Sequence, residues 1–145
     1  MAKGVSTIEL AASTEDVWTL LSDRTRYDEW LSVHYAWPDG SPADLKVGDV
    51  FAQQLKLMGP PSTVRWTVET HKSGTLLELT GQGPTEVGAR FSYAVVPTES
   101  GSSVELVLEL FGGPIDGTLG KMIEPGLCTE MEKSLKNLAE LKSRH

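Results

Sequence analysis

The feature that most constrains this chain is a succession of five alternating segments joined by short connections. The segments span residues 49–58, 63–72, 75–82, 87–96 and 104–111, with glycine- and proline-containing turns between them. Connections of two to seven residues are too short for a parallel crossover, which needs about a dozen residues or more. Successive strands must therefore be antiparallel neighbours, and the pattern predicts a β-meander.

Polarity alternates along these segments, which predicts a sheet with one covered face and one wet face. In residues 63–72, for example, Val64 and Trp66 fall on one side and charged residues on the other. The charges on the wet side predict cross-strand ion pairs rather than a catalytic cluster. These residues are Arg65, Glu78, Arg90, Glu105 and Glu109.

The chain after residue 113 is predicted to form a helix that covers one face of the sheet. Its apolar residues recur at spacings of three and four, as on one side of a helix. They are Leu119, Ile123, Leu127, Met131, Leu135, Leu138 and Leu141. Pro125 lies inside this pattern and predicts a kink or a late helix start. The glycines of residues 112–126 either weaken the front of the helix, so that it opens for a ligand, or allow close packing on the sheet.

The N-terminal part completes the fold. Residues 3–10 read as a strand, residues 14–22 as a helix capped by Ser13 or Thr14, and residues 24–30 as a second short helix capped by Asp23. Residues 31–48 are irregular, with proline and glycine turn markers. We expect one α+β domain over residues 1–145, a helix-grip fold in which a curved antiparallel sheet of six to seven strands wraps around a long C-terminal helix.

Composition excludes several classes of protein. The net charge of −7 weighs against nucleic acid or an anionic membrane as the partner. One cysteine, Cys128, excludes an internal disulfide and fits a cytoplasmic location. The N-terminus has no secretory signal pattern, no apolar run approaches the ~20 residues of a membrane span, and the three histidines are scattered. We therefore expect no metal, no cofactor and no integral membrane association.

The chain resembles the START-like, or SRPBCC, superfamily, which includes polyketide cyclase/dehydrase-like proteins, Bet v 1-type allergens and lipid-transfer domains. The resemblance covers nearly all residues. It is carried by residues 12–18, 21–23, 46–49, 65–68, 93–97 and 134–138, together with Tyr27 and Trp30. Residues 27–34 look closest to a small bacterial subgroup in which some members are described as the toxin half of a toxin–antitoxin pair.

This resemblance implies a ligand cavity between the sheet and the C-terminal helix, with a mouth near the second short helix. The implied lining is Trp30, His34, Trp37, Gln53, Leu55, Trp66, Leu79, Tyr93, Leu108, Met122, Ile123 and Leu127. Buried indole and phenol groups need a polar partner, which a ligand or water could provide. Alternatively, the side chains of Trp66, Phe91 and Tyr93 fill a small cavity themselves and leave no room for a ligand.

Three functions stay open. The first is binding or transport of a small hydrophobic, lipid- or polyketide-like ligand, because the inferred cavity face is apolar. The second is a cofactor-free cyclase/dehydrase-type enzyme that uses Tyr93 or His34 as acid or base. The third, implied by the subgroup resemblance alone, is a toxin-like regulator with an antitoxin-like protein partner.

Overall fold

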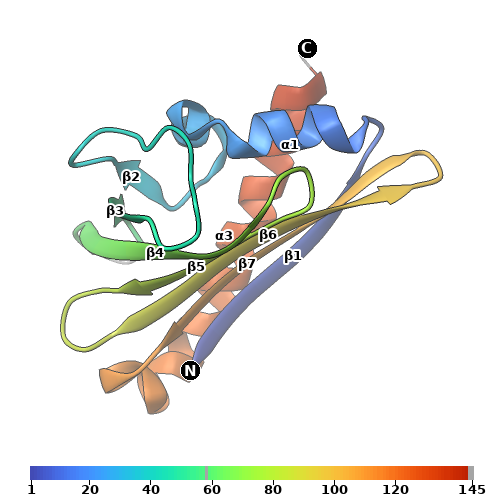
Figure 1. Ribbon diagram of the computed structural model, residues 1–145. Coiled ribbons are helices and arrows are strands. Elements are labelled where there is room, and N and C mark those ends of the chain that lie inside the picture. The colour runs from blue at the N-terminus through green and yellow to red at the C-terminus, as the bar shows by residue number, and fades with distance from the viewer. Residues whose placement is uncertain (58, 144–145) are drawn as a thin grey trace.

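Seven antiparallel strands and a long C-terminal helix dominate the computed structural model, which describes residues 1–57 and 59–143 (Figure 1). The strands are β1 (Ala2–Leu10), β2 (His34–Ala36), β3 (Val50–Leu55), β4 (Ser62–Lys72), β5 (Leu76–Gln82), β6 (Gly88–Thr98) and β7 (Gly101–Phe111). The helical elements are α1 (Thr14–Ser22), η1 (Arg24–Arg26), α2 (Tyr27–Trp30), η2 (Gly113–Asp116) and α3 (Thr118–Ser143). The predicted helix-grip architecture is confirmed.

The sheet has the order β1-β7-β6-β5-β4-β3-β2, which is the predicted meander with β1 added beside β7. Two details of the prediction are wrong. Residues 97–103, expected as a seven-residue connection, are mostly strand, because β6 continues to Thr98 and β7 begins at Gly101, and β2 lies within the segment expected to be irregular. Pro97 fits in β6 because β5 pairs with β6 only as far as Ala94, so beyond that point β6 has one free edge.

The short helices begin where the sequence indicated. The side chain of Ser13 accepts a hydrogen bond from the backbone N–H of Asp16, and that of Asp23 accepts one from Thr25. The wet face of the sheet carries one of the expected cross-strand ion pairs, between Arg90 and Glu109 at 2.7 Å. Within residues 1–57 and 59–143, no ion pair involves the other three predicted charges.

Helix α3 lies on the sheet with its predicted apolar stripe buried, apart from Leu119, which is 38% exposed. At Gly4 of β1 the helix backbone comes so close that an added Cβ would lie 2.6 Å from the carbonyl carbon of Leu127. The helix also runs through Pro125, which is exposed, so the expected late start is wrong. The carbonyl freed by the missing N–H belongs to the exposed turn around Lys121 and can be solvated.

The glycines of residues 112–126 do not behave alike. A Cβ on Gly120 would lie 2.1 Å from the carbonyl oxygen of Ile115, so close packing explains this glycine. Gly126 has open space around it, with no described atom within 4 Å of an added Cβ. Within α3, close packing therefore explains Gly120, whereas the main effect of Gly126 is to lower the helix propensity.

The two ends of the sheet differ in what covers them (Figure 1). Helices α1 and α2 lie at the end reached by the C-terminus of α3. At the other end lie the N-terminus, η2, the first turns of α3 and the turn between β5 and β6. This second end holds the largest cavity described below.

The Gly4 contact gives a stability test. Gly4→Ala should lower the free energy of unfolding by about 1–3 kcal/mol, because the added methyl group overpacks the helix backbone. Gly126→Ala is the matched control: it adds the same methyl group in open space and should raise stability by up to about 1 kcal/mol. Urea unfolding of both variants measures the difference. Equal midpoints for Gly4→Ala and the wild type would contradict the close approach.

Candidate functional site

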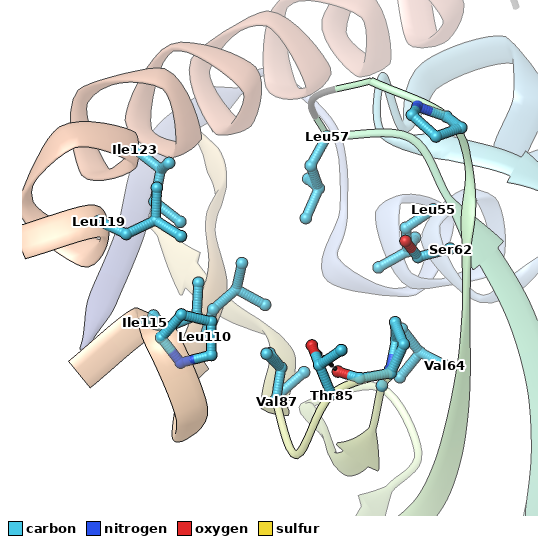
Figure 2. A pocket seen from close by; sticks show the side chains of 15 residues that line it. Leu55, Leu57, Ser62, Val64, Thr85, Val87, Leu110, Ile115, Leu119 and Ile123 are labelled. Atoms are coloured by element: carbon cyan, nitrogen blue, oxygen red, sulfur yellow. Dashed lines mark hydrogen bonds between the residues drawn. The ribbon is translucent and has the colours of Figure 1, made fainter. Parts of the chain in front are cut away.

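An apolar pocket of about 400 Å³ lies between the sheet and the N-terminal part of α3 (Figure 2). Figure 2 shows Leu119 and Ile123 reaching in from the helix and Leu57 entering from the opposite side. Strands β3, β4, β6 and β7, the β3–β4 and β5–β6 connections and η2 supply the rest of the wall. The complete lining is Leu55, Leu57, Pro60, Ser62, Val64, Gly83, Pro84, Thr85, Val87, Ala89, Leu110, Pro114, Ile115, Leu119 and Ile123.

The β5–β6 turn forms one wall of the pocket in a sparsely populated backbone conformation. Thr85 and Glu86 have φ angles of 54° and 63°, in the left-handed region that disfavours side chains with a Cβ. The backbone of Gly112 and Gly113 lies directly against this turn, since added Cβ atoms would be 2.8 Å and 2.7 Å from the carbonyl oxygens of Glu86 and Thr85. The turn is therefore held in place by the chain that leads into η2.

The lining determines what the pocket can do chemically. None of the described residues that line it is ionisable, and the side-chain polar groups are the hydroxyls of Ser62 and Thr85. The Thr85 hydroxyl already donates to the carbonyl oxygen of Pro84, at 2.7 Å. The pocket can therefore bind an apolar molecule, and these side chains provide no acid or base for a reaction.

The sequence-predicted site residues separate into three groups. Leu55 and Ile123 line this pocket, and Leu127 lines a smaller cavity beside it. Met122 lies on the surface of α3 with 72% of its area exposed. The others lie outside the pocket lining, buried or half-buried: Trp30, His34, Trp37, Gln53, Trp66, Leu79, Tyr93 and Leu108.

Aromatic side chains occupy the end of the fold where the resemblance implied a cavity mouth. The Tyr27 ring lies 5.3 Å from that of Trp30 and 5.6 Å from that of Trp37, and the Trp18 ring lies 5.4 Å from that of Tyr93. Except for Trp37, all of these rings are buried. Of the three rings expected to fill the interior, Tyr93 belongs to this cluster, and those of Phe91 and Trp66 follow it with centroid distances of 6.1 Å and 6.2 Å. The pocket lies at the other end.

The loop beside this aromatic cluster is tied down by Arg24. Its Nε donates to the carbonyl oxygen of Pro42 at 3.0 Å, and its Nη2 donates to that of Ala43. In return, the Trp37 indole donates to the carbonyl oxygen of Arg24 at 3.1 Å. The part of the loop after β2 is therefore fixed to the short helices by three hydrogen bonds.

A buried hydrogen-bonded chain links Trp66, Gln53 and His34. The indole N–H of Trp66 donates to Oε1 of Gln53 at 2.9 Å, and Nε2 of Gln53 lies 2.8 Å from Nδ1 of His34. Because an indole only donates, the amide must turn its NH₂ toward His34, whose Nδ1 then accepts and whose proton is on Nε2. The partner sought for the Trp66 indole is therefore Gln53.

The two candidate acid–base residues are both insulated from the pocket. Burial lowers the pKa of His34 below its usual range, although the nearby Asp28 carboxylate opposes that change. Burial also raises the pKa of Tyr93 well above its usual range, and neighbouring Tyr27 adds to the effect. In the described part of the chain, the Tyr93 hydroxyl and the Trp30 indole N–H are buried without a hydrogen-bond partner. At neutral pH both candidates are therefore held in their uncharged forms.

The pocket residues that sequence reasoning missed come mainly from turns. Gly83 and Pro84 belong to a turn that the sequence identified as such, and Pro114 and Ile115 belong to η2. Val87, expected to begin a strand, instead lies at the end of the same turn. The doublet of Gly112 and Gly113 was a usable signal, because it indicates a close backbone approach just beyond β7. Nothing in the strand pattern distinguishes apolar residues that face a cavity from those that face a packed neighbour.

The chain of hydrogen bonds at Gln53 can be tested through stability. Gln53→Leu should lower the free energy of unfolding by about 1–3 kcal/mol, because it leaves the buried Trp66 N–H without an acceptor. Gln54→Leu, on the opposite face of β3, should change it by less than about 0.5 kcal/mol. Urea unfolding monitored by tryptophan fluorescence measures both. Equal losses in the two variants would rule out a specific role for the amide.

The fold and the pocket together define a START-like protein, in which a curved sheet and a C-terminal helix enclose a ligand-sized space. The chain belongs to the family described as "Polyketide cyclase / dehydrase and lipid transport", which matches residues 1–141. It is similar to the protein named Toxin Rv0910 of Mycobacterium tuberculosis, with 31% identity over 137 residues that cover 94% of this chain and 95% of that protein.

Solved structures share the fold at low sequence identity. The protein TTHA0849 from Thermus thermophilus is 17% identical and superimposes with a TM-score of 0.77 over 99% of both chains. A START superfamily protein from Mycobacterium smegmatis is 19% identical, with a TM-score of 0.69 over 99% of both chains. At this level of identity the likeness concerns the fold.

Three further observations concern metal binding, membrane association and the single cysteine. Across residues 1–57 and 59–143, no three His, Cys, Asp or Glu side chains lie together in a way that could hold a metal ion. Within the same ranges, no helix combines the length and the apolar character needed to span a bilayer. Cys128 is half-buried, and its thiol donates to the carbonyl oxygen of Lys3 at 3.6 Å.

Proposed function

We propose that this protein binds or transports a small hydrophobic ligand in the pocket between the sheet and α3. The observation that carries the proposal is the pocket itself: its volume of about 400 Å³ falls within the roughly 300–1,000 Å³ of typical ligand sites. Its described lining is almost entirely aliphatic, with two hydroxyl groups and no charge. The family description, which includes lipid transport, supports the same function.

A cyclase/dehydrase-type activity has less support from the same site. General acid–base catalysis needs a group within hydrogen-bond reach of the reacting proton. His34 and Tyr93 do not line the pocket, and His34 uses Nδ1 to accept from Gln53. Binding without chemistry therefore agrees better with the arrangement of these residues.

Blocking the pocket should weaken binding. Ser62→Phe places an aromatic ring in the pocket and should weaken the binding of Nile red, a neutral apolar dye, by about tenfold or more, which corresponds to about 1.4 kcal/mol. The adjacent Thr63→Phe is the control: it adds the same ring to an exposed residue that does not line the pocket, and binding should match the wild type. Dye fluorescence titration measures both.

Native mass spectrometry extends this test to the physiological ligand. Wild-type protein, Thr63→Phe and Ser62→Phe are each expressed in the native host and purified from it. The wild type and Thr63→Phe should carry a co-purifying apolar molecule, and Ser62→Phe should lack it. Wild-type protein that is consistently empty, and that binds Nile red no better than Ser62→Phe, would refute the proposal.

A second candidate function is that of a toxin-like regulator, and the name of a relative with 31% identity favours it. Such a protein would act through an antitoxin-like partner in the cytoplasm. The single cysteine is compatible with that reducing compartment. Ligand binding and regulation are compatible, because a bound apolar molecule could bias the interaction with a partner protein.

The regulatory candidate makes a separate prediction about growth. Induced expression of the wild-type chain in its own host should slow growth relative to the empty vector. Ser62→Phe shows whether the effect needs the pocket: loss of the effect would link toxicity to ligand binding, and retention would assign it to another surface. If cells that demonstrably express the wild-type chain grow as fast as cells with the empty vector, toxicity is excluded.

A further inference from the structure

The apolar pocket continues along α3 into a second, smaller cavity. This cavity has a volume of about 100 Å³ and shares Leu57, Leu110 and Ile123 with the pocket. Its remaining lining comes from the next two turns of the helix and ends at Glu130. Figure 2 shows the Leu57 side chain extending into the pocket from the β3–β4 connection, and the same residue also lines the smaller cavity.

Among the described residues, Glu130 is the one ionisable residue that lines either space. It is half-buried, and its carboxylate is held from one side: the Ser32 hydroxyl donates to Oε2 at 2.5 Å. Within residues 1–57 and 59–143, no donor reaches its other oxygen, Oε1. The carboxylate therefore keeps an unused acceptor at the end of an apolar passage.

The surroundings of Glu130 fix its position. The Ser134 hydroxyl donates to the Glu130 carbonyl oxygen at 2.8 Å, and the backbone N–H of Ser32 donates to that hydroxyl at 2.9 Å. One turn further along, the Asn137 amide donates to the carbonyl oxygen of Trp30 at 3.3 Å. These bonds attach the end of α2 and Ser32 to the middle of α3, so the Ser32 hydroxyl is itself held in place where it donates to Oε2 of the Glu130 carboxylate.

A fixed carboxylate at one end of an apolar passage discriminates between head groups. It accepts hydrogen bonds from hydroxyl or ammonium groups, and charge-assisted bonds of this kind are stronger than neutral ones. It repels another carboxylate or a phosphate, and the net charge of −7 adds to that repulsion. The distance available is also considerable, since the seven residues from Ile123 to Glu130 correspond to about 10 Å of helix.

We propose that the ligand is an elongated apolar molecule with a hydroxyl or amino group at one end, which donates to Glu130, and that anionic amphiphiles such as fatty acids are excluded. The inference rests on the proposed function, because it assigns the head group of the ligand bound in the same pocket. The apolar body occupies the pocket, and the end that carries the head group passes Leu57 and Ile123, which line both spaces, to reach Glu130.

The test compares three probes that share one alkyl chain. Decanol, decylamine and decanoate are titrated against wild-type protein carrying Nile red, and displacement of the dye reports competition. Decanol and decylamine should each compete at least about tenfold more strongly than decanoate. The ratio of decanol to decylamine shows whether the donor that Glu130 prefers is neutral or charged.

Two variants of equal charge assign the discrimination to Glu130. Glu130→Gln should bring decanoate to within about threefold of decanol, which is less than about 0.7 kcal/mol. Glu132→Gln removes the same charge from an exposed position on the same helix and should keep the wild-type preference. If Glu130→Gln does not fold, the three-probe comparison on the wild type still decides the outcome.

The possible failures are distinguishable. Equal competition by the three probes would overturn the head-group assignment while leaving the hydrophobic pocket intact. The same holds if Glu130→Gln and Glu132→Gln behave alike. If neither Nile red nor any alkyl probe binds to the wild type, the proposed function fails together with this inference.

Discussion

The contact between α3 and β1 at Gly4 sets the spacing of the whole molecule. There the backbone of the helix meets the backbone of the strand with no side chain between them. From that line of contact the curved sheet moves away from the helix toward β4 and β3, and the space between them must be filled (Figure 1). A wider spacing at Gly4 would separate the apolar stripe of α3 from the sheet.

The chain fills this space differently at its two ends. Near α1 and α2 it uses large rings, including Trp18, Trp30 and Tyr93, and a buried amide that serves the Trp66 indole. Near η2 it uses glycine, proline, alanine and valine from the β5–β6 turn and the start of β6. Small side chains around a fixed backbone leave volume unfilled, and this explains why the pocket is here and not beneath the aromatic residues.

Much of the fold could be predicted from local pattern. Alternation in the strands and the three-and-four spacing in α3 identified the covered face, and short connections required antiparallel pairing. Strand register could not be predicted, because it depends on how each hairpin closes. Register places Phe51 opposite Trp66 and Gln53 opposite Val64, which makes Gln53 a diagonal neighbour of Trp66 on one face. The position of the pocket was unpredictable for a related reason: a residue such as Ala89 has the same sequence signal whether it faces an empty space or a packed ring.

The division between a filled end and an open end also separates two demands on the sequence. The Gly4 contact and the aromatic rings hold the fold, and they lie apart from most of the pocket wall. The wall consists largely of turn residues and strand ends, which tolerate substitution better than a packed core does. A lineage can therefore change the shape of its pocket without weakening the scaffold, which agrees with the survival of this architecture in proteins that share fewer than one residue in five with this chain.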